Sequence, residues 1–101
     1  MLYNTEWDID PAGKILLNAA DRLLRHGWCQ GYLSDGSGRN CMVGAIQKSA
    51  AAHVEGYGEA FRRLSDYLRT VAIVDWNDTV CKSKEEAIDA LRAAAFSQVT
   101  A

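Results

Sequence analysis

The sequence predicts an all-α domain, a compact bundle of about four helices with one glycine-rich loop and one connector anchored by tryptophan. Two observations support this fold class. Apolar residues recur at the three- and four-residue spacing of amphipathic helices in four segments, and residues typical of helix ends separate these segments. The mostly β-branched stretch at 71–74 has no second strand to pair with, and a lone strand is not stable. We expect one domain over residues 1–101, with its core at about 10–96 and with 1–9 and 97–101 loosely ordered.

The first helix is expected to begin after Asp10 and to cover about 11–26. The carboxylate of Asp10 can accept the free amide hydrogens of the first turn, and Pro11 follows at a position where a missing N–H has no cost. One apolar stripe then continues to Leu24, and Gly27 provides the left-handed residue that commonly ends a helix.

The second helix is expected to begin near Asn40 or Cys41 and to end at about His53. Most of its surface is apolar, so we place it at the centre of the bundle. Gly44 lowers its helix propensity by about 1 kcal/mol relative to alanine, which indicates the close approach of a neighbouring helix or of Trp28.

A third helix is expected at about 59–70. Charged residues on its outward side balance one another and indicate a solvated face, formed by Glu59, Arg62, Arg63, Asp66 and Arg69. The last helix opens with a capping box in which Ser83 and Glu86 accept each other's amide hydrogens. Residues 28–40, which contain several glycines and serines, are expected to form a flexible surface loop, and 71–82 a connector.

Composition and charge restrict the location and the partners. The net charge of −2 provides no positive field for nucleic acid, and no apolar run approaches the ~20 residues that cross a bilayer. Three cysteines are an odd number, unlike the even disulfide framework of small secreted domains, and the N-terminus has no signal-peptide pattern. We therefore expect a cytoplasmic protein with free thiols, with no nucleic-acid partner and no membrane contact.

Cys41 is the first candidate for chemistry. At the start of a helix, the helix dipole and free amides would lower the pKa of its thiol. His26 or His53 could act as the base, and Asn77 could orient a histidine as in papain-like enzymes. In an unbroken helix, however, His53 would lie roughly 18 Å from Cys41. Burial of Cys41 as a small apolar side chain is the favoured interpretation.

A zinc site is a weaker candidate. Cys29, Cys41, Cys81 and His26 would supply three thiolates and one imidazole, a ligand set that suits zinc. The intervals of about twelve and forty residues between the cysteines do not match known zinc motifs. We therefore predict no metal and no cofactor.

The connector contains the strongest local signature, the sequence Trp76-Asn77-Asp78. As a binding site it would present an aromatic ring beside an amide and carboxylates, together with Trp28. The favoured interpretation is structural, with Trp76 filling the core and with Asn77 and Asp78 bonded to neighbouring backbone as an Asx-turn. We expect this triplet to meet residues 27–28 and 41–45 where the loop and the connector reach the second helix.

The combination of these motifs resembles a family of short bacterial and phage proteins classed only as a domain of unknown function. The shared features are the Gly-Trp pair at 27–28, the C-x-x-G-A segment at 41–45, the W-N-D triplet at 76–78 and the helix that opens at Ser83. The resemblance covers about residues 12–95. It implies a helical domain and a prokaryotic or phage origin, and it supplies no activity or catalytic residue.

Three hypotheses for the function follow, and none is decided by the sequence. The first is a non-enzymatic interaction or regulatory module that binds a protein partner or forms a homodimer. The second is a small hydrolase or transferase with Cys41 as its nucleophile. The third is a structural zinc domain.

Overall fold

The computed structural model describes residues 9–51 and 54–97. Over these residues the chain is mainly helical and contains no strand, so the predicted all-α class is confirmed for them. None of the described helices is long and apolar enough to cross a membrane. The helices in chain order are α1 (Pro11–His26), α2 (Met42–Ala50), the 3-10 turn η2 (Val54–Gly56), α3 (Tyr57–Leu68), the short α4 (Ile73–Asp75), the π-helical turn η3 (Trp76–Val80) and α5 (Lys84–Phe96).

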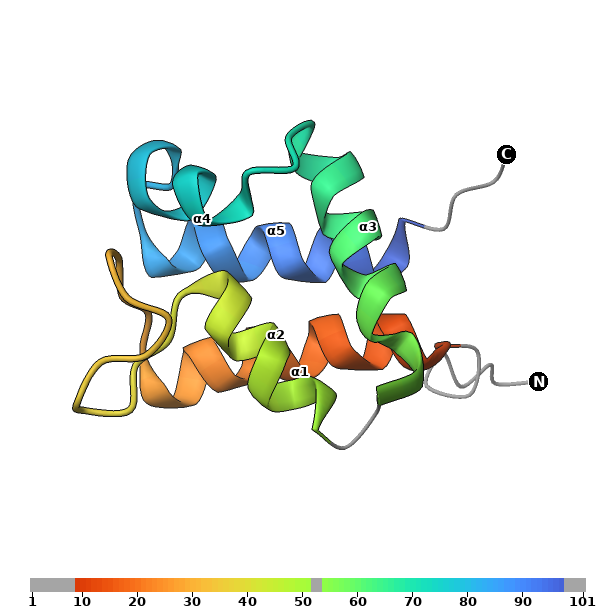
Figure 1. Cartoon of the computed structure of the whole chain (residues 1–101), viewed down its shortest axis with the longest axis horizontal. Helices are drawn as coiled ribbons and strands as arrows, with labels where there is room; N and C mark the ends of the chain where they lie inside the picture. Colours follow the sequence, from red (N-terminus) through yellow and green to blue (C-terminus); the bar gives the residue numbers. More distant parts are fainter. Residues whose placement is uncertain (1–8, 52–53, 98–101) are drawn as a thin grey trace.

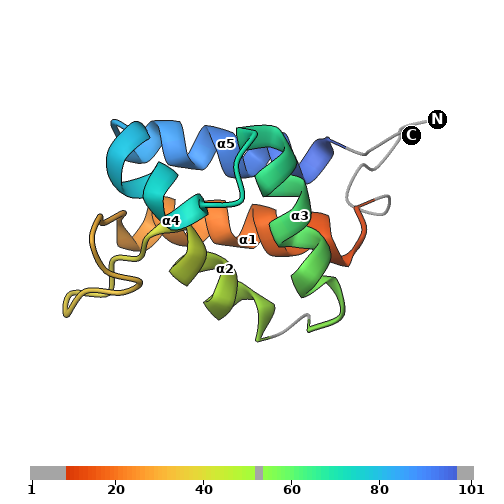
Figure 2. The same cartoon turned by 45° about the horizontal axis from the view of Figure 1, so that its top comes forward.

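The helix at the centre of the bundle is α1, which contacts α5, α2 and α3 (Figures 1 and 2). The prediction that the second helix would be central is therefore wrong. That helix has only nine residues and exposes Gln47 and Lys48, whereas α1 has sixteen residues and a continuous buried stripe. Because α1 is longer and amphipathic, it can pack against three neighbouring helices.

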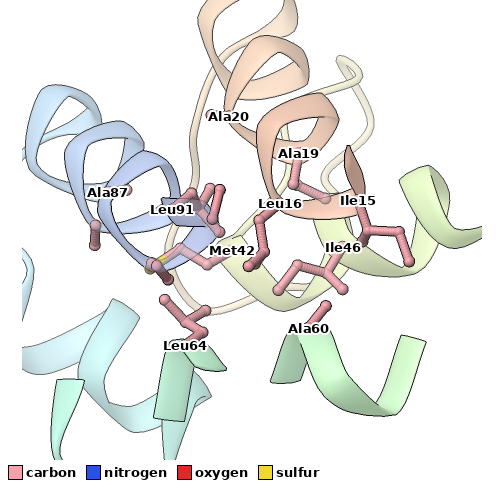
Figure 3. Packing of buried hydrophobic residues seen from close by; sticks show 14 of the residues in the cluster. Ile15, Leu16, Ala19, Ala20, Met42, Ile46, Ala60, Leu64, Ala87 and Leu91 are labelled. Atoms are coloured by element: carbon pink, nitrogen blue, oxygen red, sulfur yellow. The ribbon is translucent and has the colours of Figure 1, made fainter. Parts of the chain in front are cut away.

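The core lies between these four long helices, as Figure 3 shows. Each helix contributes large apolar side chains that are fully buried. Burial of each such side chain contributes roughly 1.5–3 kcal/mol to stability. The main contributors are Ile15, Leu16, Leu23, Met42, Ile46, Leu64 and Leu91.

The expected helix caps are present, with one change of partner. The carboxylate of Asp10 accepts the amide hydrogen of Gly13 at 2.9 Å, and the hydroxyl of Ser83 accepts that of Glu86 at 3.1 Å. The carboxylate of Glu86 accepts from Lys82 N at 2.6 Å instead of from Ser83. The second hydrogen bond of the capping box is therefore made to the backbone N of residue 82, one position before the expected residue 83.

Helix boundaries in the middle of the chain differ from the prediction. α2 ends at Ala50, and His53 lies outside the described residues. α3 covers Tyr57–Leu68 and ends at Arg69, which takes a left-handed conformation with φ of 62°. The connector at 71–82 contains α4 and η3, two short helical turns that the sequence pattern did not indicate. Of the ends expected to be loosely ordered, 1–8 and 98–101 are outside the described residues.

Arg63 contradicts the expectation of a solvated face on α3. Its side chain is buried, with 6% of the residue exposed. The guanidinium forms ion pairs with Asp10 and with Glu59, and it donates to the carbonyl of Ala95. A single charged group thus joins the start of α1, α3 and the end of α5, and its charge is compensated where it is buried.

Candidate functional site

Asn77 lies fully buried in η3 and uses every hydrogen-bonding position of its amide. Its Oδ1 accepts from Trp28 Nε1 at 2.7 Å and from the backbone N of Met42 at 3.1 Å. Its Nδ2 donates to the carbonyl of Cys29 at 3.1 Å and to Asp78 Oδ1 at 2.9 Å. Two donors and two acceptor positions are all that an asparagine side chain offers. Asn77 therefore joins the loop, the start of α2 and the connector.

The first part of the loop at 28–40 is also attached to η3. Gln30 Nε2 lies 3.0, 3.1 and 3.2 Å from the carbonyl oxygens of Asn77, Asp78 and Cys81. The backbone N of Gly31 donates to Asp78 Oδ1 at 3.0 Å. Figure 1 shows this loop beside the connector, at the end of the bundle where α5 begins. Sequence reasoning missed Gln30, because no local pattern marks a side chain whose partners are about fifty residues away.

The two ends of the loop meet through the backbone. Cys29 N donates to the carbonyl of Asn40 at 3.0 Å, and Asn40 N donates to the carbonyl of Gly27 at 3.2 Å. Gly27 ends α1 with φ of 103°, a conformation that favours glycine, as predicted. The loop therefore starts and finishes at one point next to the last turn of α1.

The middle of the loop is held against α2. The carbonyl of Leu33 accepts from Cys41 N at 3.2 Å and from Asn40 Nδ2 at 3.2 Å. A side chain at Gly44 would overlap this same carbonyl group. Gly44 is therefore needed for the approach of the loop backbone, not for that of a helix or of Trp28 as we expected.

The tip of the loop is organised by Asp35. Its Oδ1 accepts from Ser37 N at 2.9 Å and Arg39 N at 3.0 Å, and its Oδ2 pairs with Arg39 Nε at 2.6 Å. Desolvation pushes the pKa of this carboxyl upward, but the amide hydrogen bonds and the guanidinium outweigh it and hold the pKa below the ordinary value. The carboxylate is thus kept ionised and paired.

Two apolar side chains next to this turn remain exposed. Tyr32 is 70% exposed and Leu33 is 45% exposed. Tyr32, the neighbour of Leu33 in the chain, lines a hollow of about 380 Å³ that the loop forms on its outer side. Its lining residues are Trp28, Cys29, Gln30, Tyr32, Asp35 and Arg39.

The structure does not assemble the cysteine-dependent site. Cys41 is 1% exposed, and its sulfur accepts the amide hydrogen of Gly44 at 3.4 Å as the N-cap of α2. His26 is exposed on the last turn of α1, and within residues 9–51 and 54–97 no hydrogen bond connects it to Cys41. The amide of Asn77 has no bond left with which to orient a histidine.

The other two thiols form hydrogen bonds with carbonyl groups two or three residues away. Cys29 donates to the carbonyl of Tyr32 at 3.4 Å, and Cys81 donates to that of Ser83 at 3.3 Å. Burial raises the pKa of both thiols. The described part of the chain holds no group of three or more His, Cys, Asp or Glu side chains placed to bind a metal ion, so the three cysteines and His26 do not form the zinc set considered above.

The tryptophan triplet is structural in a different way from the expected Asx-turn. Trp76 is partly buried and packs against the core instead of filling it as predicted. Asn77 bonds Trp28, Cys29 and Met42, which are 35 to 49 residues away in sequence. Residues 27–28, 41–45 and 76–77 lie together as expected. The hydrogen bonds of Asn77 join the three segments.

Fold and site together define a small all-α fold in which a loop is fixed onto the turn η3 and the start of α2. Residues 9–97 match the family DUF6197, described as a family of unknown function. The chain belongs to this family. No match was found among curated proteins or among solved structures.

Proposed function

We propose that this protein is a non-enzymatic interaction module, whose loop at 28–40 binds a peptide segment of another protein. One observation carries the proposal. Asn77 and Asp78 hold the start of the loop and α2 holds its middle, while Tyr32 and Leu33 stay exposed. A binding loop that is already fixed loses little conformational entropy when its partner arrives.

The hollow beside Tyr32 supports a peptide as the partner. Its volume of about 380 Å³ suits one or two side chains, and the ring of Trp28 contributes to its wall. Asp35 and Arg39 are paired with each other, so the hollow presents no net charge to a ligand. We infer that it takes an uncharged aromatic side chain, because tyrosine and tryptophan are among the residues that most often anchor such contacts and the paired Asp35 leaves no free carboxylate for an arginine.

The alternative of a cysteine-dependent enzyme has less support. A nucleophilic cysteine is partly exposed and has a base within hydrogen-bonding distance. Cys41 is 1% exposed, and its sulfur caps a helix. An interaction module needs neither property.

Location, origin and self-association are part of the same proposal. Cys29, Cys41 and Cys81 are free and buried, which supports a reducing compartment such as the cytoplasm. The motif resemblance supports a bacterial or phage origin. A second copy of the chain is the alternative occupant of the loop, and a homodimer would then form through Tyr32 and Leu33.

The test places a photoreactive benzoylphenylalanine at position 32, with position 67 as the matched control. Tyr67 is a half-exposed tyrosine on α3, away from the loop. A protein that crosslinks at position 32 alone is then purified, and its Kd is measured against the wild type, Tyr32→Ala and Tyr67→Ala. We expect Tyr32→Ala to weaken binding at least about tenfold, as for a central aromatic anchor, and Tyr67→Ala to have no effect.

Equal Kd values for the two variants would overturn the proposal, as would the lack of any crosslink specific to position 32. Crosslinking between two copies of the chain at position 32 would replace the peptide partner by the homodimer. In that case the sedimentation behaviour of the wild type and of Tyr32→Ala should differ.

A further inference from the structure

A second hollow, of about 340 Å³, lies between α1 and α2 and shares no residue with the hollow of the loop. The proposed interaction does not use it. One face of the second half of α1 and the last turn of α2 form its wall. Its lining residues are Asn18, Asp21, Arg22, Arg25, His26, Lys48 and Ser49.

Positive charge exceeds negative charge in this hollow. Arg22, Arg25 and Lys48 face a single carboxylate, Asp21, although the whole chain has a net charge of −2. Asp21 pairs with Arg25, at 2.8 Å between Oδ2 and Nε. Within the described ranges, Arg22 and Lys48 form no ion pair with a carboxylate, so both charges in the hollow are free; outside it, Arg69 and Arg92 are also unpaired.

The position of the charges relative to the helix ends is informative. Arg25 and His26 stand in the last turn of α1, where positive groups offset the partial negative charge of the helix C-terminus. Arg22 lies one turn earlier, and Lys48 belongs to the other helix. These two cations are therefore not explained by the end of α1.

Ser49 gives an independent indication of a ligand. It is 7% exposed and lines the hollow. Its hydroxyl forms no hydrogen bond with any of the residues that the structure describes. Its oxygen is open to the hollow, so the hydroxyl hydrogen is available to a ligand that accepts it.

We propose that this hollow binds the phosphate group of a small molecule. Arg22 and Lys48 supply two positive charges and several N–H donors, and Ser49 supplies an O–H donor in the same lining. Two uncompensated charges match a phosphate dianion better than a carboxylate. A hollow of about 340 Å³ holds a phosphate group with room for the organic part of an ester.

The test is an NMR titration of the ¹⁵N-labelled protein with inorganic phosphate and with glycerol 3-phosphate, at constant ionic strength maintained by chloride. Acetate is the control anion. Arg22→Gln, Lys48→Gln and Ser49→Ala probe the hollow. Arg92→Gln is the matched control, because Arg92 is exposed on α5 and removing it changes the net charge equally.

We expect saturable shifts at Arg22, Lys48 and Ser49 with both phosphate probes. The Kd should rise about tenfold in Arg22→Gln and in Ser49→Ala, the loss expected for one charge-assisted hydrogen bond, and should not change in Arg92→Gln. Tighter binding of the ester would identify an ester as the source of the phosphate, and equal binding would identify free phosphate.

Three results would overturn the proposal: shifts that do not saturate, equal binding of acetate, or equal weakening by Arg92→Gln. Lys48→Gln keeps the test valid if Arg22→Gln does not fold, because Lys48 is exposed and its replacement leaves the core intact. The melting temperature of Ser49→Ala should equal or exceed that of the wild type. This would separate a binding role from a structural one.

Discussion

The indole N–H of Trp28 donates to the side-chain oxygen of Asn77 at 2.7 Å, across 49 residues of sequence. The same oxygen accepts the backbone N–H of Met42, the first residue of α2. One amide therefore holds the loop, a helix start and the connector in a common arrangement. The peptide-binding surface proposed for Tyr32 and Leu33 depends on this arrangement.

Removal of this amide should destabilise the whole domain. Asn77→Ala would leave the N–H groups of Trp28 and Met42 and the carbonyl of Cys29 without their partner. Each unsatisfied buried group costs about 1–3 kcal/mol, so we expect a total of about 3 kcal/mol or more after relaxation. Urea denaturation measures this loss. Asn18→Ala, at an exposed position of α1, is the control and should stay within about 0.5 kcal/mol of the wild type.

Replacement of two different glycines by alanine should change the stability of the protein in opposite directions. In Gly44→Ala the new methyl group would overlap the carbonyl of Leu33, so the melting temperature should fall although alanine favours the helix. In Gly58→Ala, within α3, the methyl group meets no atom within 4 Å, and a gain of about 0.5 kcal/mol is expected. Thermal unfolding of the pair decides the matter. A rise for both variants would show that the loop can move away from α2.

The contrast between these glycines shows what the sequence can and cannot predict. The caps at Asp10 and Ser83 depend on residues within three positions, and they were predictable for that reason. The neighbour of Gly44 is the carbonyl of Leu33, which reaches it only because the loop folds back. A sequence pattern indicates that a glycine needs space, and tertiary structure decides what occupies that space.

The candidate site also combines residues that the sequence marks with residues that it does not mark. The motifs Gly27-Trp28 and Trp76-Asn77 were recognisable as sequence, and their meeting could be expected. Gln30 has no motif, and its three carbonyl partners lie 47 to 51 residues away. Arg63 was expected on a solvated face because its helix neighbours are charged, but its partner Asp10 comes from the far end of the chain. Long-range polar pairs of this kind leave no periodic signal.

The ion pair between Arg63 and Asp10 should make stability depend on acid pH. The Arg63 guanidinium is the main cause that lowers the pKa of the Asp10 carboxyl from its ordinary value of 3.8. A lowered native pKa means that the stabilisation is complete above the ordinary pKa and disappears as the pH falls through the lower native value. The free energy of unfolding should therefore decrease below about pH 5.

The matched variants are Arg63→Met and Arg92→Met. At pH 7 the free energy of unfolding of Arg63→Met should be lower than that of the wild type. The difference between the two free energies should become smaller as the pH falls, because protonated Asp10 no longer benefits from the guanidinium. Urea midpoints between pH 7 and pH 2.5 measure this. Arg92→Met, at an exposed position on α5, should run parallel to the wild type. A constant difference for Arg63→Met across the series would refute the proposed coupling to Asp10.

The last prediction separates a structural Cys41 from a catalytic one. The sulfur caps α2 through the amide of Gly44, and the residue is 1% exposed. Cys41→Ala should therefore cost less than about 1 kcal/mol for the lost cap, because sulfur is a weak acceptor, in addition to the lost packing. Cys41→Ser should retain the cap, because a hydroxyl is a good acceptor at this position. In chemical denaturation the serine variant should have a higher free energy of unfolding than the alanine variant.

Alkylation kinetics complete the test, with the extent of labelling at each cysteine read by mass spectrometry of its peptide. A buried thiol reacts only when the domain opens, so its rate should follow the opening equilibrium. We expect slow labelling of Cys41 in the wild type, the same rate in His26→Ala, and faster labelling in Asn77→Ala in proportion to the stability lost. Fast labelling at neutral pH that collapses in His26→Ala would instead reveal a thiolate paired with an imidazole. The domain would then have to be reconsidered as an enzyme.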